Sequence, residues 1–241
     1  MNDRFRILKV ITVSFLMFLV TGNFSYAQKS GQSGKLKVKP VAFKNLNQVD
    51  IGKLTKAGTA VITNGELVIE GSGADIWGKH DEFHFSYLKL KGDFDLSVRI
   101  LGLTATHLYT KAGIMAREDL SDDSPHVYYQ VFPNNSARNK NNDGCEFQYR
   151  TTKTGDMKAI YPADGVDKVE CKVDFPNTYI RMKRQGDHFE SFFSNDNKNW
   201  VHYSTFALKM ANELYVGLAV TSHQSTDYTT AKFSSCMLGK K

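Results

Sequence analysis

The stretch from Lys111 to Glu118 reads KAGIMARE, and its alternation of side chains decides the fold. In an extended strand, successive side chains point to opposite faces, so every second residue shares a face. One face of this stretch then carries only small and aliphatic side chains, and the other ends in a cation. The first set is Ala112, Ile114 and Ala116, and the second is Gly113, Met115 and Arg117. We expect a central β-strand here.

Two later runs repeat this pattern and extend the predicted sheet. In His126–Val131 and Glu146–Arg150, alternate residues are apolar, and these are Val127, Tyr129, Val131, Phe147 and Tyr149. If the three strands are neighbours, one sheet face is core and the opposite face is polar. The polar face, our candidate ligand site, would carry Arg117, His126, Tyr128, Gln130, Glu146, Gln148 and Arg150. The alternative is an ordinary solvated face, since antiparallel sheets often expose one side to water.

The first 27 residues are typical of a secretory signal peptide. Three basic residues precede an apolar run from Val10 to Val20, and Ser25-Tyr26-Ala27 supplies small residues at a cleavage site. We therefore expect a secreted or periplasmic protein, cleaved after Ala27, with no membrane span in the mature chain. Residues 28–40 are rich in Gly, Ser and Lys and are predicted to be a flexible leader.

Charge and cysteine content narrow the function classes. The formal net charge of +6 falls to +4 without the signal segment, and the charges are interleaved, which argues against a nucleic-acid partner. An exported chain with three cysteines can form one disulfide, but the sequence does not choose among Cys145, Cys171 and Cys236. Three reduced cysteines remain the alternative. The oligomeric state is likewise open.

Turn signals divide the rest of the chain into roughly a dozen short strands. Thr59–Thr63, Asn64-Gly65 and Glu66–Glu70 predict a hairpin with a two-residue turn. Tyr179–Arg184 and His188–Phe193 flank a second turn, and no amphipathic helix pattern appears. The pattern predicts one all-β domain over residues 41–241, an antiparallel sandwich or barrel.

Several ordered segments carry a family resemblance. They include Gly71–Gly78, Phe83-His84-Phe85, Lys111–Glu118, Phe147–Arg150, Ser194–Trp200 and Tyr215–His223. Over residues 44–238 the chain resembles the secreted bacterial concanavalin-A-like (lectin/glucanase-like) sandwich domains labelled regulation-of-enolase-like. The resemblance implies a two-sheet antiparallel jelly roll whose concave face holds a glycan. It implies an accessory module in carbohydrate-active systems more than any one activity.

The sequence also contains carboxylates and histidines that could serve hydrolysis or bind a metal ion. Retaining glycosidases need two carboxylates about 5 Å apart, and no strand carries such a pair at same-face spacing. His80 and His84 do not fit a zinc site, because extended residues four apart lie roughly 13 Å from each other. Asp75 and Asp81 flank a glycine-rich loop and offer oxygen donors for calcium. The simpler interpretation is that Asp75 caps its own loop.

We therefore expect a secreted, non-catalytic carbohydrate-binding or accessory protein with no required cofactor, calcium being the one alternative. Trp77 joins the predicted ligand-binding set as a flat aromatic face, although a lone Trp beside Ile76 more often packs in a core. The partner would be a polysaccharide or other glycan. A glycoside hydrolase with carboxylates from different strands is one alternative. A structural surface module with no small ligand is the other.

Overall fold

The computed structural model describes residues 37–136, 138, 143–160 and 170–240. Within these residues the chain forms 17 β-strands and one short 3-10 helix, η1 (Phe43–Asn45), and no α-helix. The predicted signal peptide and residues 28–36 of the predicted leader lie outside the described residues. No described helix is long and apolar enough to cross a membrane. The all-β prediction is confirmed.

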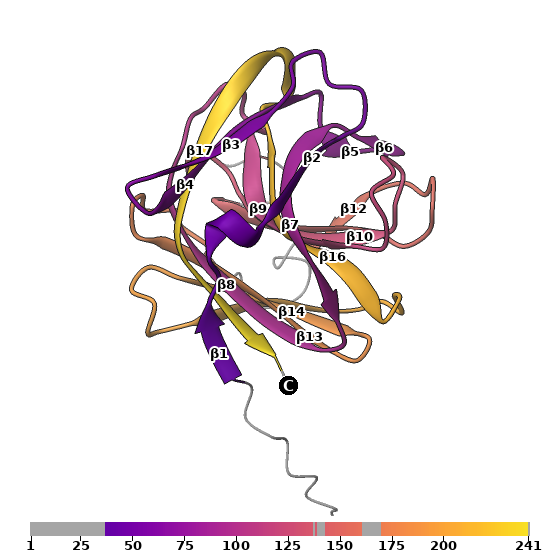
Figure 1. Ribbon diagram of the computed structural model, residues 1–241, viewed down its shortest axis with the longest axis vertical. Helices are drawn as coiled ribbons and strands as arrows, with labels where there is room; N and C mark the ends of the chain where they lie inside the picture. Colours follow the sequence, from indigo (N-terminus) through magenta and orange to yellow (C-terminus); the bar gives the residue numbers. More distant parts are fainter. Residues whose placement is uncertain (1–36, 137, 139–142, 161–169, 241) are drawn as a thin grey trace, which may run out of the picture. The chain divides into compact units, whose positions relative to one another are not determined.

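Two antiparallel sheets make up the fold (Figure 1). The first, sheet A, has the spatial order β15 (Val201–Ala207), β14 (His188–Ser194), β13 (Thr178–Gln185), β8 (Phe94–Leu103), β17 (Gln224–Lys240), β4 (Glu66–Gly73) and β3 (Thr59–Thr63). The second, sheet B, has the order β12 (Lys158–Ile160), β11 (Cys145–Arg150), β10 (His126–Val131), β9 (Lys111–Arg117), β16 (Glu213–Thr221), β7 (Phe83–Lys91) and β2 (Asn47–Ile51). A small hairpin joins β5 (Ile76–Trp77) to β6 (His80–Asp81).

The start of the sandwich lies earlier than the sequence predicted. Residues Lys37–Pro40 form β1, which pairs antiparallel with the end of β17, so the last four residues of the predicted leader belong to the fold. The composition of Lys37–Pro40 predicted a flexible segment because all four side chains are polar or exposed. Backbone pairing with β17, which composition does not encode, holds the strand in place.

The turns follow the local chemistry of the sequence. Asn64 and Gly65 both adopt positive φ, 53° and 81°, as the two-residue turn between β3 and β4 requires. In the turn after β14, the Asp196 carboxylate accepts hydrogen bonds from the backbone amides of Lys198 and Asn199. These bonds hold the pKa of Asp196 well below its usual range. The Asn64-Gly65 turn was predicted from sequence.

The main core lies between the sheets. Ala112, Ile114 and Ala116 of β9 face it, together with Val127 and Tyr129 of β10, as the alternation predicted. Sheet A contributes side chains such as Phe94, Ile180 and Phe233 to the same cluster. The register pairs Tyr129 with Ile114 on one side and with Phe147 on the other. The three strands are therefore neighbours, as expected.

Over β9 and β10 the outer face of sheet B is also buried, whereas the sequence analysis expected a ligand site or a solvated face there. A second apolar cluster forms there around Phe83, Phe85, Met115 and Tyr128. Ile76 of the β5–β6 hairpin belongs to this cluster and is fully buried, so the hairpin packs onto the sheet. Every residue of β9 is consequently buried, on both faces. The face is a covered layer, not a solvated one.

One disulfide joins Cys145 at the start of β11 to Cys171. Cys236 is a free, buried thiol, and burial raises its pKa to about 12. The structure thus selects one of the three pairings that the sequence left open. The disulfide ties sheet B to the segment that leads into β13.

Candidate functional site

A buried polar cluster lies at one end of the covered face of sheet B. Register places His126 between Arg117 and Arg150, and all three converge on Asp81 of β6. Arg150 Nη1 and Nη2 donate to the two Asp81 oxygens at 2.7 and 2.8 Å. Arg117 Nη2 and His126 Nδ1 lie 3.7 and 3.6 Å from Asp81 Oδ2. All four side chains are fully buried.

This cluster fastens the hairpin to the sheet. Arg150 also donates to the carbonyl oxygens of Gly78 and Gly155, and Arg117 donates to those of Asp119 and Ser121. The two guanidinium groups thus donate hydrogen bonds to oxygen atoms of the protein itself. Their planar fork suits this role, because one arginine can serve several carbonyl and carboxylate oxygens at once.

Burial dominates the electrostatics of the cluster. It lowers the pKa of His126 to about 4; the carboxylate of Asp81 opposes this shift, and the two arginines reinforce it. Burial likewise lowers the pKa of Arg117 to about 10, against the attraction of Asp81. His126 is therefore neutral at pH 7, and Asp81 balances guanidinium charge alone.

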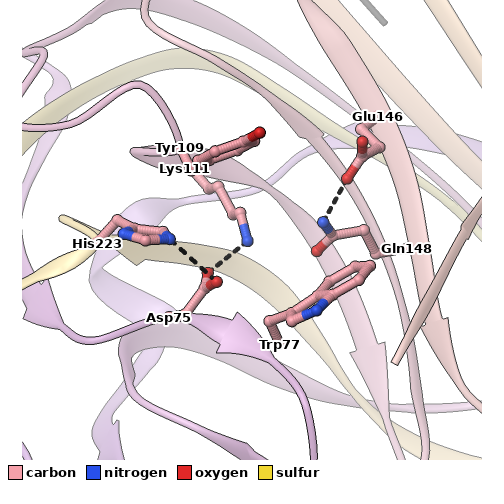
Figure 2. A pocket seen from close by; sticks show the side chains of 7 residues that line it. All are labelled: Asp75, Trp77, Tyr109, Lys111, Glu146, Gln148 and His223. Atoms are coloured by element: carbon pink, nitrogen blue, oxygen red, sulfur yellow. Dashed lines mark hydrogen bonds and ion pairs between the residues drawn. The ribbon is translucent and has the colours of Figure 1, made fainter. Parts of the chain in front are cut away.

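Next to the cluster, the surface opens into a pocket of about 280 Å³. Four regions of the chain meet there: the start of the β5–β6 hairpin, the start of β9, the middle of β11 and the loop after β16 (Figure 2). The lining residues are Asp75, Trp77, Tyr109, Lys111, Glu146, Gln148 and His223. This volume is at the lower end of the roughly 300–1,000 Å³ typical of small-molecule sites.

Asp75 is held ionised at one side of the pocket. Its carboxylate contacts the ammonium of Lys111 and lies 3.2 Å from His223 Nε2. Burial raises the pKa of Asp75, but the charge of Lys111 and hydrogen bonds from His223 and Lys111 outweigh it and bring the pKa to about 2. His223 in turn stacks on His107, with ring centroids 4.2 Å apart and planes 8° from parallel. The stack fixes the imidazole against Asp75.

Two buried side chains of the lining, Lys111 and Gln148, point toward one another. Gln148 donates from Nε2 to Glu146 Oε1, whereas its Oε1 is buried and has no hydrogen-bond partner among the described residues. Lys111 donates to Asp75 and to the carbonyl oxygen of Ile76, which uses two of its three N–H groups. Figure 2 shows the Lys111 ammonium and the Gln148 side chain pointing toward the same space. The lining thus places an acceptor without a hydrogen-bond partner among the described residues near the Lys111 ammonium.

Aromatic side chains form part of the wall. Trp77 is 40% exposed, because Ile76, its neighbour on β5, takes the buried side of the hairpin. Its ring centroid lies 5.8 Å from Lys111 Nζ. Tyr109 lies across the pocket and packs against His223, with ring centroids 5.6 Å apart. Trp77 is therefore an exposed platform and not the core residue that its isolated position favoured.

The structure divides the predicted ligand-binding set. Trp77, Glu146 and Gln148 line the pocket. Arg117, His126 and Arg150 belong to the buried cluster, Tyr128 donates to the Ala219 carbonyl oxygen, and Gln130 is fully buried. Neither side-chain amide atom of Gln130 has a partner among the described residues. These five residues lie on the predicted face but outside the lining of the pocket.

Four lining residues were not predicted to bind a ligand: Asp75 (named only for calcium), Tyr109, Lys111 and His223. For Lys111 a signal existed, because alternation places it on the same face as Arg117. For Tyr109 and His223 none did, since both lie in loops. His223 adopts a positive φ of 57°, a backbone conformation that a non-glycine residue takes only rarely.

The carboxylates considered for calcium have protein partners instead. Asp75 contacts Lys111 and His223, and Asp81 contacts Arg150. His80 pairs with Asp122, whereas His84 bonds to Asp50 and Gln48 on β2. Among the described residues, no group of three His, Cys, Asp or Glu side chains could hold a metal ion. In this structure Asp75, Asp81, His80 and His84 are thus all engaged with protein partners.

No family model matches the sequence, and no curated protein matches it either. Solved structures do match. A functionally unknown protein from Saccharomyces cerevisiae superposes with a TM-score of 0.62 at 15% identity, over 82% of this chain and 97% of that chain. A mutant of the GH43 protein BlXynB from Bacillus licheniformis gives 0.55 at 10% identity, over 74% of this chain and 34% of that chain. The carbohydrate-binding module CBM66 from Bacillus subtilis gives 0.52 at 16% identity, over 81% and 98%.

At these identities the likeness shows the fold alone. The chain is an antiparallel two-sheet jelly-roll sandwich, as the sequence predicted. Fold does not fix function in such widely used architectures, so the function must be argued from the site.

Proposed function

We propose that this is a secreted, non-catalytic carbohydrate-binding protein that holds a sugar residue in the pocket between Trp77 and Lys111. One observation carries the proposal: Gln148 Oε1, an acceptor with no hydrogen-bond partner among the described residues, and the Lys111 ammonium point toward one another at the lining of the pocket. A hydroxyl group both accepts and donates, so a single sugar hydroxyl can satisfy both atoms. Leaving a buried polar atom unsatisfied costs about 1–3 kcal/mol, which binding would recover.

The rest of the lining fits the same chemistry. Trp77 and Tyr109 offer flat apolar surfaces for the C–H face of a sugar ring, and Glu146 and His223 add polar groups at the rim. Small-molecule sites characteristically combine such apolar walls with a few fixed polar groups. The fold likeness to CBM66 supports the proposal, as do the predicted signal peptide and the resemblance to secreted bacterial sandwich domains.

The proposal narrows the predicted site on the concave face. Arg117, His126 and Arg150 act beneath the pocket, because they hold the hairpin that carries Trp77. Tyr128 and Gln130 support the floor of the same face. None of these five residues is proposed to touch the first sugar residue.

A glycan array with purified protein tests the proposal, with and without calcium. We expect the wild-type protein to retain one class of glycan in both buffers, and Gln148→Met to lose it. Gln185→Met, an exposed glutamine at the end of β13, is the matched control and should bind like the wild type. Folded protein that retains no glycan in either buffer would contradict the proposal. Equal retention by Gln148→Met would contradict the site.

A glycoside hydrolase is the second candidate, because two carboxylates from different parts of the chain, Asp75 in the loop before β5 and Glu146 on β11, line the same pocket. Asp75 is ionised and would serve as nucleophile or base, so Glu146 would have to supply the proton to the leaving group. Measuring reducing ends released from any retained glycan separates the candidates. Release that Glu146→Gln abolishes would favour the hydrolase, and no release favours the binding protein.

A further inference from the structure

The pocket has a neighbouring hollow that shares part of its lining. A second hollow of about 540 Å³ is lined by Lys53, Ala74, His80 and Asp122, among others, and it shares Asp75 and Trp77 with the pocket. Trp77 lines both hollows, and its indole is 40% exposed. The same indole therefore borders both hollows.

We infer that the protein binds an uncharged glycan chain of at least two sugar units, with one unit in the pocket and the next across Trp77 in the second hollow. This inference rests on the proposed function. The pocket alone is small for a binding site, whereas the two hollows together lie well within the usual size range. A monosaccharide would leave the whole of the larger hollow exposed to water.

Charge on the second hollow selects the class of glycan. Its lining includes one lysine, Lys53, against the carboxylates of Glu82 and Asp122 in addition to Asp75. Glu82 Oε2 accepts the backbone N–H of Ala74, and Asp122 Oδ2 lies 3.3 Å from His80 Nδ1, so both carboxylates are fixed at the wall. A uronate or sulfated unit placed there would meet like charge. Neutral sugar units would instead offer hydroxyl donors to these acceptors.

The two tryptophans of the chain give a direct readout. Trp200 lies after β14 in sheet A, and its replacement in Trp200→Phe leaves Trp77 as the single emitting tryptophan. We would titrate this protein with glucose, xylose, mannose, galactose and fructose, with their neutral di- and tetrasaccharides, and with tetragalacturonate, and follow emission and heat. We expect at least one neutral tetrasaccharide to bind at least tenfold more tightly than its monosaccharide and to shift Trp77 emission.

Filling the second hollow supplies the decisive variant. Ala74 is exposed, so Ala74→Gln should fold normally and occupy the hollow; thermal melts would check this. We expect it to bring tetrasaccharide affinity down to that of the monosaccharide. His188→Ala, an exposed histidine on sheet A, controls for surface substitution and should change nothing.

Each outcome decides between the two claims. Equal affinity for mono- and tetrasaccharide, or an unchanged tetrasaccharide advantage in Ala74→Gln, would overturn the two-unit site while leaving the proposed function intact. Binding of tetragalacturonate in preference to neutral chains would overturn the uncharged class. Heat without a change in Trp77 emission would show that the indole is not contacted. No response to any probe by either method would overturn the proposed function together with this inference.

Discussion

Replacing Asp81 with asparagine tests whether the buried polar cluster stabilises the hairpin that carries Trp77. Asp81 is fully buried, binds Arg150 through both oxygens at 2.7 and 2.8 Å and lies 3.7 Å from Arg117. Asparagine keeps the shape but removes the charge. Two buried guanidinium groups would then lack the carboxylate that balances their charge. Removing one partner of a buried ion pair is strongly destabilising, because the remaining charge is left uncompensated.

The magnitude follows from burial. Removing one partner of a buried ion pair costs about 3–5 kcal/mol, a large part of the roughly 5–15 kcal/mol by which domains are stable. An exposed pair contributes only about 0–1 kcal/mol. Lys172 and Glu170 form such a pair at 2.9 Å, with side chains 64% and 54% exposed. Glu170→Gln is therefore the matched control.

Urea denaturation of the three proteins measures the difference. We expect the free energy of unfolding to fall by about 3–5 kcal/mol in Asp81→Asn and by less than about 1 kcal/mol in Glu170→Gln. Because Arg150 also bonds to the turn at Gly78, amide hydrogen exchange in residues 76–81 should quicken in Asp81→Asn. Equal costs in the two variants would refute the reasoning. A large cost without faster exchange there would show that the cluster does not fasten the hairpin.

Three further predictions concern pH and the disulfide. The pKa of His126 is about 4 in the folded chain against an ordinary 6.5, so the unfolded chain takes up this proton first as the pH falls. The free energy of unfolding should therefore fall by about 3 kcal/mol between pH 6.5 and pH 4. Urea midpoints measured across this range should depend less on pH in His126→Gln than in the wild type. The pKa of Asp75 is lowered to about 2, so the stability that its carboxylate contributes is fully present above pH 3.8. The free energy of unfolding should fall by about 2 kcal/mol between pH 3.8 and pH 2. An acid titration of Asp75→Asn should lack this loss. Replacing both Cys145 and Cys171, which lie 26 residues apart, with serine should lower the free energy of unfolding by about 3–4 kcal/mol, and dithiothreitol should then have no further effect on the urea midpoint.

The sequence by itself determined three central strands of sheet B, β9, β10 and β11, and the side of each that faces the main core. Alternation is a local property, because neighbouring side chains on a strand must point to opposite faces. It therefore placed Ile114, Val127 and Phe147 in the core correctly. The turn at Asn64-Gly65 was also predicted correctly, because the positive φ that it requires depends on the two residues themselves.

Only the tertiary structure decided what lies over the opposite face. Alternation put Arg117, His126 and Gln148 on one side of sheet B, but it carries no information about which segment covers them. The covering hairpin brings Asp81 to Arg150 across 69 residues of sequence, and it turns Trp77 outward because Ile76 packs inward. The pocket lining is likewise assembled from four separate parts of the chain. Side chains that meet only through folding leave no shared pattern in sequence, so the buried cluster and the open pocket could not be told apart before the packing was known.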